Sequence, residues 1–552
     1  MAEVRHSDEV ENREKFVNLR HKNAAAMQER KYPVGIQTFE KLREENYLYI
    51  DKTDLVWKMT KESPYVFLSR PRRFGKSLLC STLECYFEGR KDLFEGLAIA
   101  ELEKDWKQYP VLRFDLSACK NQPNMQEVVR TLEDELKDYE RIYGRDETET
   151  TPGKRFKGLI QRAHEQTGLK TVVILDEYDA PMLDYLHKPD ELEQVRRIMQ
   201  EFYQYIKICD KDEQFVFITG ISKFSQLSIF STINNLTNIS MQPKYAAICG
   251  ITEEEFTTDM APDIAMLAKE YDCTSEQMHD KLKQQYDGYR FAKESPDVYN
   301  PFSLLKCFNQ RNIANYWFES GTPTFLIRQM QHFRTDITTL EELNVQDFDF
   351  DQPTEAMNNA LPLLYQSGYL TIKGYDRESE MYTLSIPNQE VRIGFTRGLL
   401  PAYIGLENHQ VVSGFALKFW QALKKNDLDL ALREMQSYFA GLPYVDGFKK
   451  KLEDISNLEA FYEWSMMLIF NMLNVYVQTQ VRCAGGRADI VVKMPDTIYV
   501  IELKVNGTAQ EALDQIEVKG YATPYLTDGR KIVKAGVKFS TETKTLEDWV
   551  IK

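Results

Sequence analysis

The feature that most constrains the fold is a strand that leads straight into a Gly-Lys-Ser loop and a helix. The apolar run Tyr65–Ser69 predicts a buried strand, Arg70–Ser77 follows as the loop, and a helix is expected over Leu78–Phe87. The first N–H groups of a helix have no partners within it, so they can hold phosphate oxygens. The stretch therefore predicts a P-loop at the end of a core strand.

The residues of this loop have distinct expected roles. Lys76 should reach the terminal phosphates, and the hydroxyl of Ser77 should bind Mg²⁺. The loop departs from the standard pattern because Arg70 stands where glycine is usual. A Gly-Lys-Ser triplet alone also fits an ordinary surface loop, so the assignment needs a second motif.

A second apolar run, Thr171–Leu175, provides that motif because Asp176 and Glu177 follow at its end. In nucleotide hydrolases an Asp in this position holds Mg²⁺ and a Glu polarises the attacking water. The alternative is a buried strand that simply runs into an acidic loop. Two half-motifs at the ends of two core strands favour nucleotide binding.

Further apolar runs at Val111–Leu116 and Phe215–Thr219 alternate with helix-length segments, among them Met125–Tyr143 and Leu192–Ile208. Strands that alternate with helices predict βαβ units around a mostly parallel sheet. Tyr245–Ile251 is expected to add a fifth strand.

The length of 552 residues is too great for one compact core and predicts several domains. We expect a charged helical lead-in over 1–31, the α/β domain over 32–251, a mainly helical region over 252–455, and a further domain over 456–552. The sequence shows no repeat of fixed period.

Composition excludes several classes of protein. No run approaches the roughly 20 apolar residues of a spanning helix, and the first thirty residues lack the apolar core of a signal peptide. The 8 cysteines and 7 histidines do not cluster, which argues against a zinc site and a disulfide framework. The formal charge of −15 argues against non-specific coating of nucleic acid. We expect a cytoplasmic protein without a membrane partner.

A second chemical pattern lies near the carboxyl terminus. Asp489 lies on the strand-like run Ala488–Val492, and Glu502 and Lys504 lie on the next run, Ile498–Lys504. Positions i and i+2 of a strand face the same side, so Glu502 and Lys504 should point together, and a hairpin would bring Asp489 beside them. Two carboxylates can bind Mg²⁺, and the lysine can position or deprotonate the attacking water. The pattern predicts a metal-dependent nuclease.

The same chain contains a natural control for this pattern. Glu135-Leu136-Lys137 repeats the tripeptide of residues 502–504, but it lies in a helix-like stretch without an upstream aspartate on a strand. The tripeptide alone therefore carries no information, and the strand context with Asp489 is what counts. Residues 481–552 carry 11 Lys/Arg and 10 Asp/Glu, so this block repels DNA least.

Several motifs in the first 310 residues resemble the bacterial AAA-ATPase-like domain, in which a glycine-less Arg-Pro-Arg-Arg-Phe-Gly-Lys-Ser loop is typical. The resemblance covers about residues 32–310 and lies in Pro33–Ile36, Tyr49–Thr53, Arg70–Ser77, Leu175–Asp179, Thr219–Ser225, Tyr286–Phe291 and Tyr299–Pro301. It implies a nucleotide site made of Arg72, Arg73, Phe74, Gly75, Lys76, Ser77, Leu78, Asp176 and Ser222, with Glu177 as the catalytic carboxylate. By analogy Ser222 senses the γ-phosphate, although a plain turn serine fits as well. Arg72 and Arg73 either pair with phosphate oxygens or cover the surface.

The carboxyl-terminal block resembles the PD-(D/E)XK nuclease domain that is found fused to such ATPase-like domains. The resemblance covers about residues 460–552 and lies in Gly486–Asp489, Glu502–Lys504 and Ala512–Ile516 with Gly520-Tyr521. It implies catalytic roles for Asp489, Glu502, Lys504 and Gln515, with the two carboxylates as metal ligands. Glu463 is either an additional acidic residue of the site or a solvated residue on a helix face.

Together these features predict an α/β protein: a P-loop NTPase with a parallel sheet and flanking helices, a mainly helical middle region, and a carboxyl-terminal α/β restriction-endonuclease-like domain. The expected cofactors are ATP and Mg²⁺, with Mn²⁺ as an alternative at the nuclease site. The expected partner is nucleic acid, with DNA favoured over RNA, and a homo-oligomer is left open. The leading hypothesis is an ATPase that controls a nuclease. The alternatives are a nucleotide-dependent switch that binds nucleic acid without cutting and a protein-remodelling ATPase.

Overall fold

The computed structural model describes residues 30–222, 236–320, 342–395, 421–440 and 476–552, apart from gaps of one to four residues within these ranges, together with a few isolated residues between them. The lead-in before residue 30, Lys223–Ser225, Glu463 and the apolar stretch around it lie outside the described residues. The chain forms two compact units: residues up to 282 with 295–313, and residues 283–294 with those from 314 onward. The expected domain boundaries at 31/32, 251/252 and 455/456 stay predictions.

The first unit is built on a five-stranded parallel sheet of order β2-β3-β4-β1-β5. Four of these strands confirm the apolar runs of the sequence: β1 (Tyr65–Ser69), β2 (Val111–Asp115), β3 (Thr171–Asp176) and β4 (Glu213–Gly220). All six residues of β3 are buried, as expected for a strand that is covered on both faces.

The fifth strand was predicted in the wrong place. β5 is the two-residue segment Thr237–Asn238, whereas Tyr245–Ile251 forms no strand of this sheet. The carbonyls of Tyr245 and Ala246 accept hydrogen bonds from the guanidinium of Arg70, and Ile251 belongs instead to β6 (Ile251–Thr252), which pairs with β7 (Val298–Tyr299). The apolar residues of this segment are buried in a turn. An apolar run therefore indicated burial here but not a strand.

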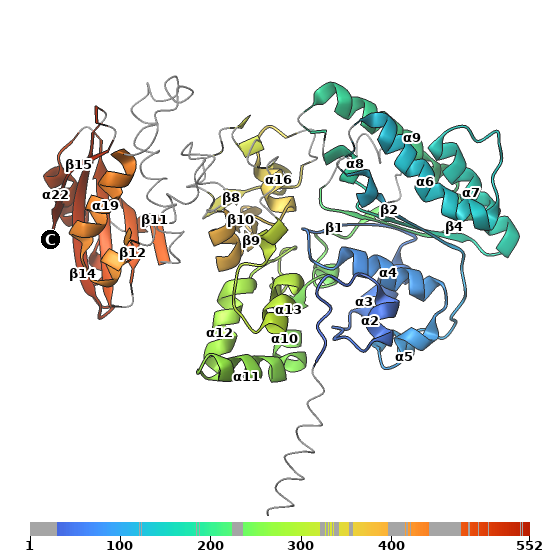
Figure 1. Cartoon of the computed structure of the whole chain (residues 1–552), viewed down its shortest axis with the longest axis horizontal. Helices are drawn as coiled ribbons and strands as arrows, with labels where there is room; N and C mark the ends of the chain where they lie inside the picture. The colour runs from blue at the N-terminus through green and yellow to red at the C-terminus, as the bar shows by residue number, and fades with distance from the viewer. Residues whose placement is uncertain are drawn as a thin grey trace, which may run out of the picture. The chain divides into compact units, whose positions relative to one another are not determined.

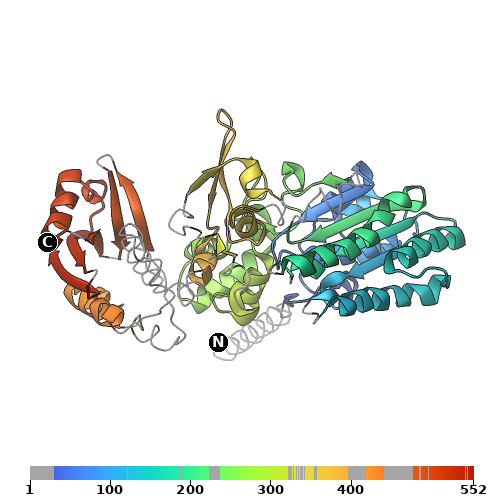
Figure 2. The same cartoon turned by 90° about the horizontal axis from the view of Figure 1, so that it is seen from above.

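Helices cover both faces of the parallel sheet, as Figure 1 shows. One face carries α6, α7 and α9, which run along the strands in teal in Figure 2. The other face carries α4 and the shorter helices before and after it. The helices of this part of the chain are α2 (Phe39–Glu44), α3 (Thr53–Glu62), α4 (Lys76–Phe87), α5 (Ala98–Leu102), α6 (Met125–Tyr143), α7 (Pro152–Thr167), α8 (Ala180–Leu183) and α9 (Pro189–Ile208).

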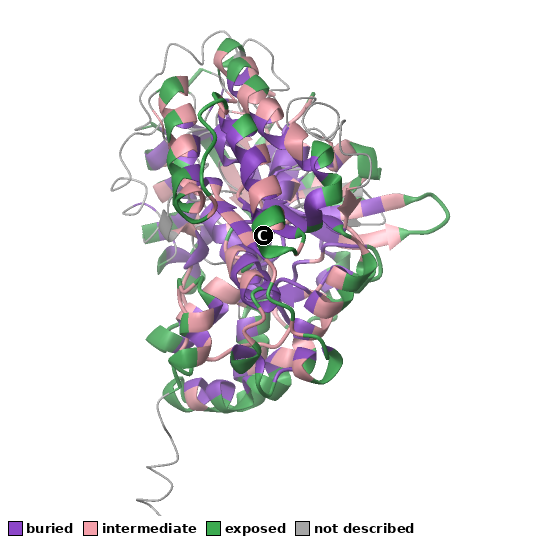
Figure 3. Cartoon of the chain, turned by 90° about the vertical axis from the view of Figure 1, so that its right-hand side faces the viewer, coloured by how far each residue is buried: buried purple, intermediate pink, exposed green. Residues whose placement is uncertain are grey.

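The core between the sheet and the α6–α7–α9 layer is aromatic. Phe156 stacks on Phe202 with ring centroids 4.6 Å apart, and Phe114 of β2 meets Phe156 edge to face. Figure 3 shows this interior as buried and the outward faces of the helices as exposed. Burial of such side chains is the main source of stability of the layer.

One buried acid lies at the amino-terminal end of β4, opposite to the P-loop edge. Glu213 is 5% exposed; its Oε2 accepts the hydroxyl of Tyr65 at 2.9 Å, and its Oε1 has no hydrogen-bond partner among the described residues. Burial raises the pKa of Glu213 to about 8, the nearby charges of Asp210 and Asp212 add to the shift, and the Tyr65 hydrogen bond opposes it. The ordinary value is 4.5.

Glu213→Gln is expected to flatten the pH dependence of stability of the first unit. Folded protein keeps this proton up to about pH 8, whereas unfolded chain loses it near 4.5, so wild type loses stability as the pH rises between these values. The loss is at most about 5 kcal/mol, and the amide avoids it. Melting temperatures should match at pH 4.5 and favour the variant at pH 9; a pH-independent difference would contradict the assignment. Exposed Glu147→Gln, in the loop between α6 and α7, is the control.

The remaining helices of the first unit follow β5. They are α10 (Glu253–Asp259), α11 (Ala261–Glu270), α12 (Ser275–Tyr286), whose last turn belongs to the second unit, and α13 (Pro301–Gln310). α10 begins with a complete capping box between Thr252 and Glu255, and Asn300 caps α13. These residues confirm that helices dominate after Thr252.

The second unit contains a small sheet that the sequence did not predict. Its order is β8 (Leu343–Val345), β10 (Met381–Ser385), β9 (Thr371–Asp376), all antiparallel, with α15 (Asp347–Phe350) and α16 (Leu361–Gln366) beside it. β9 and β10 are short, and β10 pairs with a register shift. Short strands with weak alternation give little periodic signal.

The motif Tyr286–Phe291 has a structural role in this unit. Gly288 has φ +93°, and a Cβ on it would lie 2.5 Å from the carbonyl oxygen of Pro387. The amide of Arg290 donates to the hydroxyl of Thr371, which donates back to the carbonyl of Arg290. The motif thus holds the end of α12 against strand β9.

The carboxyl-terminal part of the second unit is a mixed sheet of order β11-β12-β13-β14-β15. Only β13 and β14 are parallel, and α22 (Ala509–Lys519) connects them and packs on both. The strands are β11 (Tyr476–Cys483), β12 (Gly486–Lys493), β13 (Thr497–Lys504), β14 (Lys531–Phe539) and β15 (Leu546–Ile551). Among the described residues, no helix combines the length and apolar character needed to span a bilayer.

Helix α19 (Leu428–Ala440) packs against this sheet, although it lies before residue 456, where the carboxyl-terminal domain was expected to begin. Gln436 donates to the carbonyl of Leu546 and accepts from the hydroxyl of Thr545, and the indole of Trp549 donates to Asp429 at 2.8 Å. The carboxyl-terminal sheet therefore has α22 and α19 as packing partners.

Candidate nucleotide and nuclease sites

The P-loop joins β1 to α4 at the carboxyl edge of the parallel sheet. Gly75 is the N-cap of α4 with φ +90°, a left-handed conformation that glycine adopts without strain. The turn places the first N–H groups of α4 at the loop, where they can bind an anion. Strand β3, which β4 separates from β1, ends at the same edge, and β2 ends in register with β3, with Asp115 opposite Asp176.

Lys76 is buried and folds back onto its own loop. Its Nζ donates to the carbonyls of Arg70 and Pro71, each at 3.1 Å. Burial lowers the pKa of Lys76, while the carboxylates of Asp176 and Asp179 raise it. A cation held this way can exchange carbonyls for phosphate oxygens with little movement.

Asp176 fits a magnesium site. It is completely buried; its Oδ1 accepts the amide of Glu177 at 3.0 Å, and its Oδ2 has no hydrogen-bond partner among the described residues. Burial raises the pKa of this carboxyl, and the Ser77 hydroxyl and the Lys76 charge lower it. An unsatisfied buried carboxylate oxygen is costly, and a bound cation would remove that cost. Ser77 and Asp176 are thus suitable Mg²⁺ ligands.

Glu177 adopts a left-handed backbone conformation with φ +50°, which is rare for glutamate and marks local strain. Its carboxylate forms an ion pair with Lys120, the residue that follows η2 (Leu116–Cys119) after β2. Both side chains are partly exposed at the edge of the sheet. Sequence reasoning missed Lys120 because no motif marks it.

Ser222 lies at this edge but its hydroxyl is engaged. It is completely buried and donates to Oδ2 of Asp179 at 2.6 Å, and the amides of Ile221 and Ser222 bind the same carboxylate. The close approach of Asp179 depends on Gly220, where a Cβ would lie 2.3 Å from Oδ1 of that aspartate. A γ-phosphate role for Ser222 stays a prediction.

The three arginines of the loop have different surroundings. Arg70, which replaces the usual glycine, is 2% exposed and donates to the carbonyls of Ser69, Ser240, Tyr245 and Ala246. It therefore anchors the start of the loop to the segment after β5. Arg73 has φ +69° and stacks on the ring of Phe302 at 4.0 Å, whereas Arg72 is exposed.

An apolar cavity of about 100 Å³ lies beside the P-loop within the first unit. Phe74, Gly75 and Leu78 of the loop form part of its wall. Tyr49 and Ile248 are among the other lining residues. A flat apolar group attached to a phosphate chain would find a surface of suitable character here.

The second site forms where β12 meets β13. Ile490 pairs with Ile501, so Asp489 stands opposite Glu502. The amide of Leu503 donates to Oδ2 of Asp489 at 2.8 Å, and the amide of Asp489 approaches Oε2 of Glu502 at 3.4 Å. The hairpin expected from the sequence therefore brings the two carboxylates together.

Side chains of β13 alternate between the two faces of the sheet, as a strand requires. Ile498 and Val500 pack beneath α22, and Glu502 lies on this same face. Thr497 and Tyr499 face the other way and donate to Asn426 beside α19. Glu502 is 2% exposed, whereas Lys504, two residues further along, is partly exposed at the open end.

α22 completes this site. The side-chain amide of Gln515 donates to Oε1 of Glu502 and approaches the hydroxyl of Tyr521 at 3.3 Å. Lys504 Nζ lies 3.8 Å from the same Oε1. The helix can approach because Gly536 of β14, the register partner of Glu502, lacks a side chain: a Cβ there would lie 2.0 Å from the carbonyl oxygen of Ala509. No sequence motif marks this glycine.

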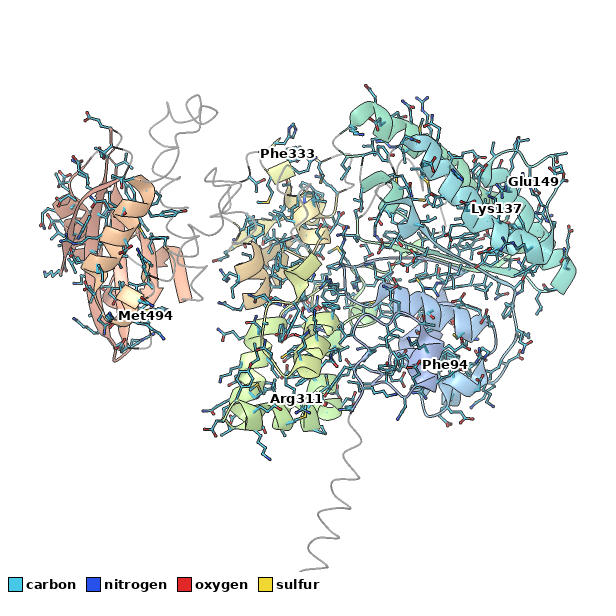
Figure 4. The ribbon with its side chains drawn as sticks, in the orientation of Figure 1. Phe94, Lys137, Glu149, Arg311, Phe333 and Met494 are labelled. Atoms are coloured by element: carbon cyan, nitrogen blue, oxygen red, sulfur yellow. The ribbon has the colours of Figure 1, made fainter. Side chains whose placement is uncertain are left out.

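The carboxylates of Asp489 and Glu502 suit a divalent cation, since hard cations prefer oxygen ligands. The described residues contain no cluster of three or more acidic, His or Cys ligands, and Glu463 lies outside them. The other copy of the tripeptide, Glu135–Lys137, lies on a helix, as the sequence predicted. Lys137, labelled in Figure 4, lies on α6 and pairs with Asp134.

Comparisons with known proteins match the two segments of the chain that contain these residues. Residues 33–230 match the family model of predicted AAA-ATPases, and residues 457–549 match the PD-(D/E)XK nuclease superfamily. The chain is 34% identical over 538 residues to an uncharacterized protein in the vnfD 5' region of Azotobacter chroococcum mcd 1, covering 95% of this chain and 99% of that one. The chain belongs to this family of AAA-ATPase-like proteins with a PD-(D/E)XK nuclease domain.

The P-loop motif and the nuclease motif each lie within a segment that matches a family model. The Lys76 loop and the Asp176-Glu177 pair lie within the matched AAA-ATPase-like segment, and the Asp489–Lys504 hairpin lies within the matched nuclease segment. The fold class expected from the sequence is confirmed: a parallel sheet with flanking helices, a helical middle, and a mixed sheet at the carboxyl terminus. The alignment with the relative covers 95% of this chain and so extends over both matched segments.

Proposed function

We propose that this protein is an ATPase whose nucleotide state controls a carboxyl-terminal, metal-dependent nuclease. The observation that carries the proposal is the convergence of Asp489, Glu502, Lys504 and Gln515 at one end of β13 in a chain that also has a P-loop. Packing alone explains neither the nuclease residues nor the P-loop residues. In each group, charged side chains lie buried or half-buried beside one another.

The nucleotide half rests on the carboxyl edge of the parallel sheet. Lys76 and the first turn of α4 would bind the phosphates, Ser77 and Asp176 would hold Mg²⁺, and the apolar cavity beside Phe74 and Leu78 would take the base. Glu177 would polarise the attacking water. Bound Mg²⁺ would neutralise charge that develops on the phosphates.

The nuclease half rests on the β12–β13 hairpin. Asp489 and Glu502 would hold Mg²⁺ or Mn²⁺, with Gln515 fixing the orientation of the Glu502 carboxylate. Lys504 would orient or deprotonate the attacking water. A bound metal ion would lower the pKa of water and stabilise the phosphorane-like transition state. DNA is the favoured substrate, and RNA is the other polymer of the same chemistry.

The test is incubation of the full-length protein with end-labelled single- and double-stranded DNA and RNA, with Mg²⁺, Mn²⁺ or chelator, and with or without ATP. Metal-dependent cleavage of any of these polymers supports the nuclease. Binding without cleavage under every metal condition would favour a nucleotide-dependent switch. ATP hydrolysis that responds to protein partners and not to nucleic acid would favour a protein-remodelling ATPase.

Control of the nuclease by nucleotide is motivated by the connectivity of the chain. It passes between the two compact units at 282/283, 294/295 and 313/314, and about two hundred residues separate β6 from the nuclease block, far more than a tether needs. A folded connection can transmit a change if nucleotide binds two of its states unequally.

We therefore expect cleavage rates to differ among nucleotide-free protein, protein with ADP and protein with a slowly hydrolysed ATP analogue. Free Mg²⁺ must be held constant, because ATP chelates the metal that the nuclease needs. Lys76→Ala should abolish the differences without touching the nuclease residues. Equal rates in all three states would mean that the two activities are independent.

A further inference from the structure

Lys538 of β14 lies next to Lys504 on the face of the carboxyl-terminal sheet that carries the candidate nuclease site. β13 and β14 are parallel and pair in continuous register, with Lys504 opposite Lys538. Lys534 of β14 donates to Oε1 of Glu517 on α22, so the residues two and four positions further along this strand also point to the α22 face. The two lysines therefore share one end and one face of the sheet, on the side of α22 (Figure 1).

The contacts of Lys538 give it no large part in stability. Its Nζ lies 2.8 Å from Oε2 of Glu547, and both side chains are partly exposed, Lys538 by 32% and Glu547 by 46%. Ion pairs at such positions contribute little to the free energy of folding. The hydrogen bond from Glu547 raises the pKa of Lys538, and the charges of Asp548 and Glu542 add to the shift. The ammonium is therefore charged at neutral pH and open to solvent at the end of the sheet.

The carboxylates around Lys538 all lie on one side of it. The pairing of β14 with β15 shifts register just after Lys538, and Glu547 is the extra residue of β15. Such bulges redirect side chains at the edges of sheets. Glu547, Asp548 and Glu542 are exposed and lie on β15 or in the turn before it, whereas the neighbour on β13 is Lys504. A nucleic-acid backbone would be attracted along the line from Lys504 to Lys538 and repelled beyond it.

We propose that Lys538 binds the backbone phosphate next to the scissile phosphate of a DNA strand that crosses the end of β13 toward β14. Adjacent strands of a sheet lie about 4.8 Å apart, so the flexible side chain of Lys538 can reach the next phosphate of a backbone that passes Lys504. A phosphate contact carries no sequence information, but it fixes the position of the strand over Asp489 and Glu502. The inference rests on the proposed nuclease function and adds a substrate-binding residue to it.

Two consequences separate this role from a structural one. A lysine that neutralises one phosphate displaces one set of condensed counterions, so its loss changes the salt dependence of binding as well as the affinity. A lysine that binds the neighbouring phosphate and not the reacting one affects the concentration of DNA needed for cleavage more than the rate at saturation. A general loss of folding would produce neither pattern.

The experiment titrates the full chain with a fluorescent single-stranded DNA and with its duplex at several salt concentrations, in the Asp489→Asn background, which keeps the DNA intact. Lys538→Gln should lower affinity for DNA about 3–10-fold. It should also reduce the slope of log K against log salt by about 0.7 for the single strand and about 0.9 for the duplex. Lys538→Arg should keep the original slope. With Asp489 intact, Lys538→Gln should raise the DNA concentration for half-maximal cleavage and leave the single-turnover rate at saturating DNA within about threefold.

Lys534→Gln is the matched control, because this lysine lies on the same strand and face, is 23% exposed and also pairs with a glutamate. It lies four residues, about 13 Å, before Lys538, and its variant should keep the affinity and the salt slope of the parent protein. Equal losses in the two lysine variants, or an unchanged slope in Lys538→Gln, would overturn the inference and leave the nuclease proposal in place. Failure of the wild-type chain to bind or cleave DNA or RNA would overturn both.

Discussion

Asp489→Asn is expected to reduce metal-dependent cleavage by about a thousandfold or more, because several kcal/mol of transition-state stabilisation by the metal depend on this ligand. Asparagine is the sharper substitution than alanine. The Asp489 side chain accepts the amide of Leu503 at 2.8 Å, and an amide oxygen can keep that hydrogen bond while removing the negative charge. The measurement is the single-turnover rate on the preferred labelled polymer at saturating Mg²⁺.

Lys504→Ala should reduce the same rate strongly with little effect on stability, since its Nζ lies 3.8 Å from Glu502 and the side chain is partly exposed. The control uses the helical copy of the tripeptide. Lys137→Ala removes a lysine two residues after a glutamate in the same sequence, but on α6, and it should cut at the wild-type rate. Equal loss of cleavage in the two lysine variants would contradict the argument from strand context. Unchanged melting curves would confirm that the losses are chemical.

The strands of both sites could be predicted from sequence because their side chains carry a simple pattern. Thr171–Leu175 and Phe215–Thr219 are unbroken apolar runs, and such runs suit central strands covered on both faces. On β13 the strict alternation separates Glu502 and Lys504 from Leu503. The two-residue period of β13 and the β12–β13 hairpin together determine which side chains meet at the candidate nuclease site.

The elements that were missed depend on contacts across long stretches of chain. Tyr245–Ile251 has the apolar composition of a strand, but the carbonyls of Tyr245 and Ala246 accept hydrogen bonds from Arg70, which lies 175 and 176 residues earlier, and not from a neighbouring strand. Lys120 matters only because β2 and β3 are adjacent in the sheet. Gly536 matters only because α22 crosses it. No local periodicity encodes such contacts.

Arg70 shows how the loop can keep a defined shape although it departs from the usual motif. The position is usually glycine so that the backbone can turn tightly before the phosphates. Here the guanidinium is buried and binds four carbonyls behind the loop, so it braces the turn from outside and leaves the phosphate side to the backbone and Lys76. The resemblance to a family with this loop therefore has a physical basis.

Lys76→Ala is expected to lower Mg²⁺-ATP affinity by about a hundredfold or more, because it removes a desolvated positive charge that only the phosphates can fully satisfy. In wild type the Nζ binds the carbonyls of Arg70 and Pro71, and solvent can reach these carbonyls once the side chain is gone. The loss should therefore appear in titrations with both ATP and ADP, and the melting temperature should change little.

Glu177→Gln supplies the contrasting result that makes the Lys76 prediction specific. It should bind ATP at least as well as wild type and hydrolyse it far more slowly, because an amide cannot accept the proton of the attacking water. Binding lost in one variant and turnover lost in the other would assign phosphate binding to the loop after β1 and water activation to the residue after β3. If Lys76→Ala binds ATP with unchanged affinity by calorimetry, the loop between β1 and α4 does not hold the phosphates. If Glu177→Gln turns over normally, the carboxylate that activates water must come from elsewhere at this edge.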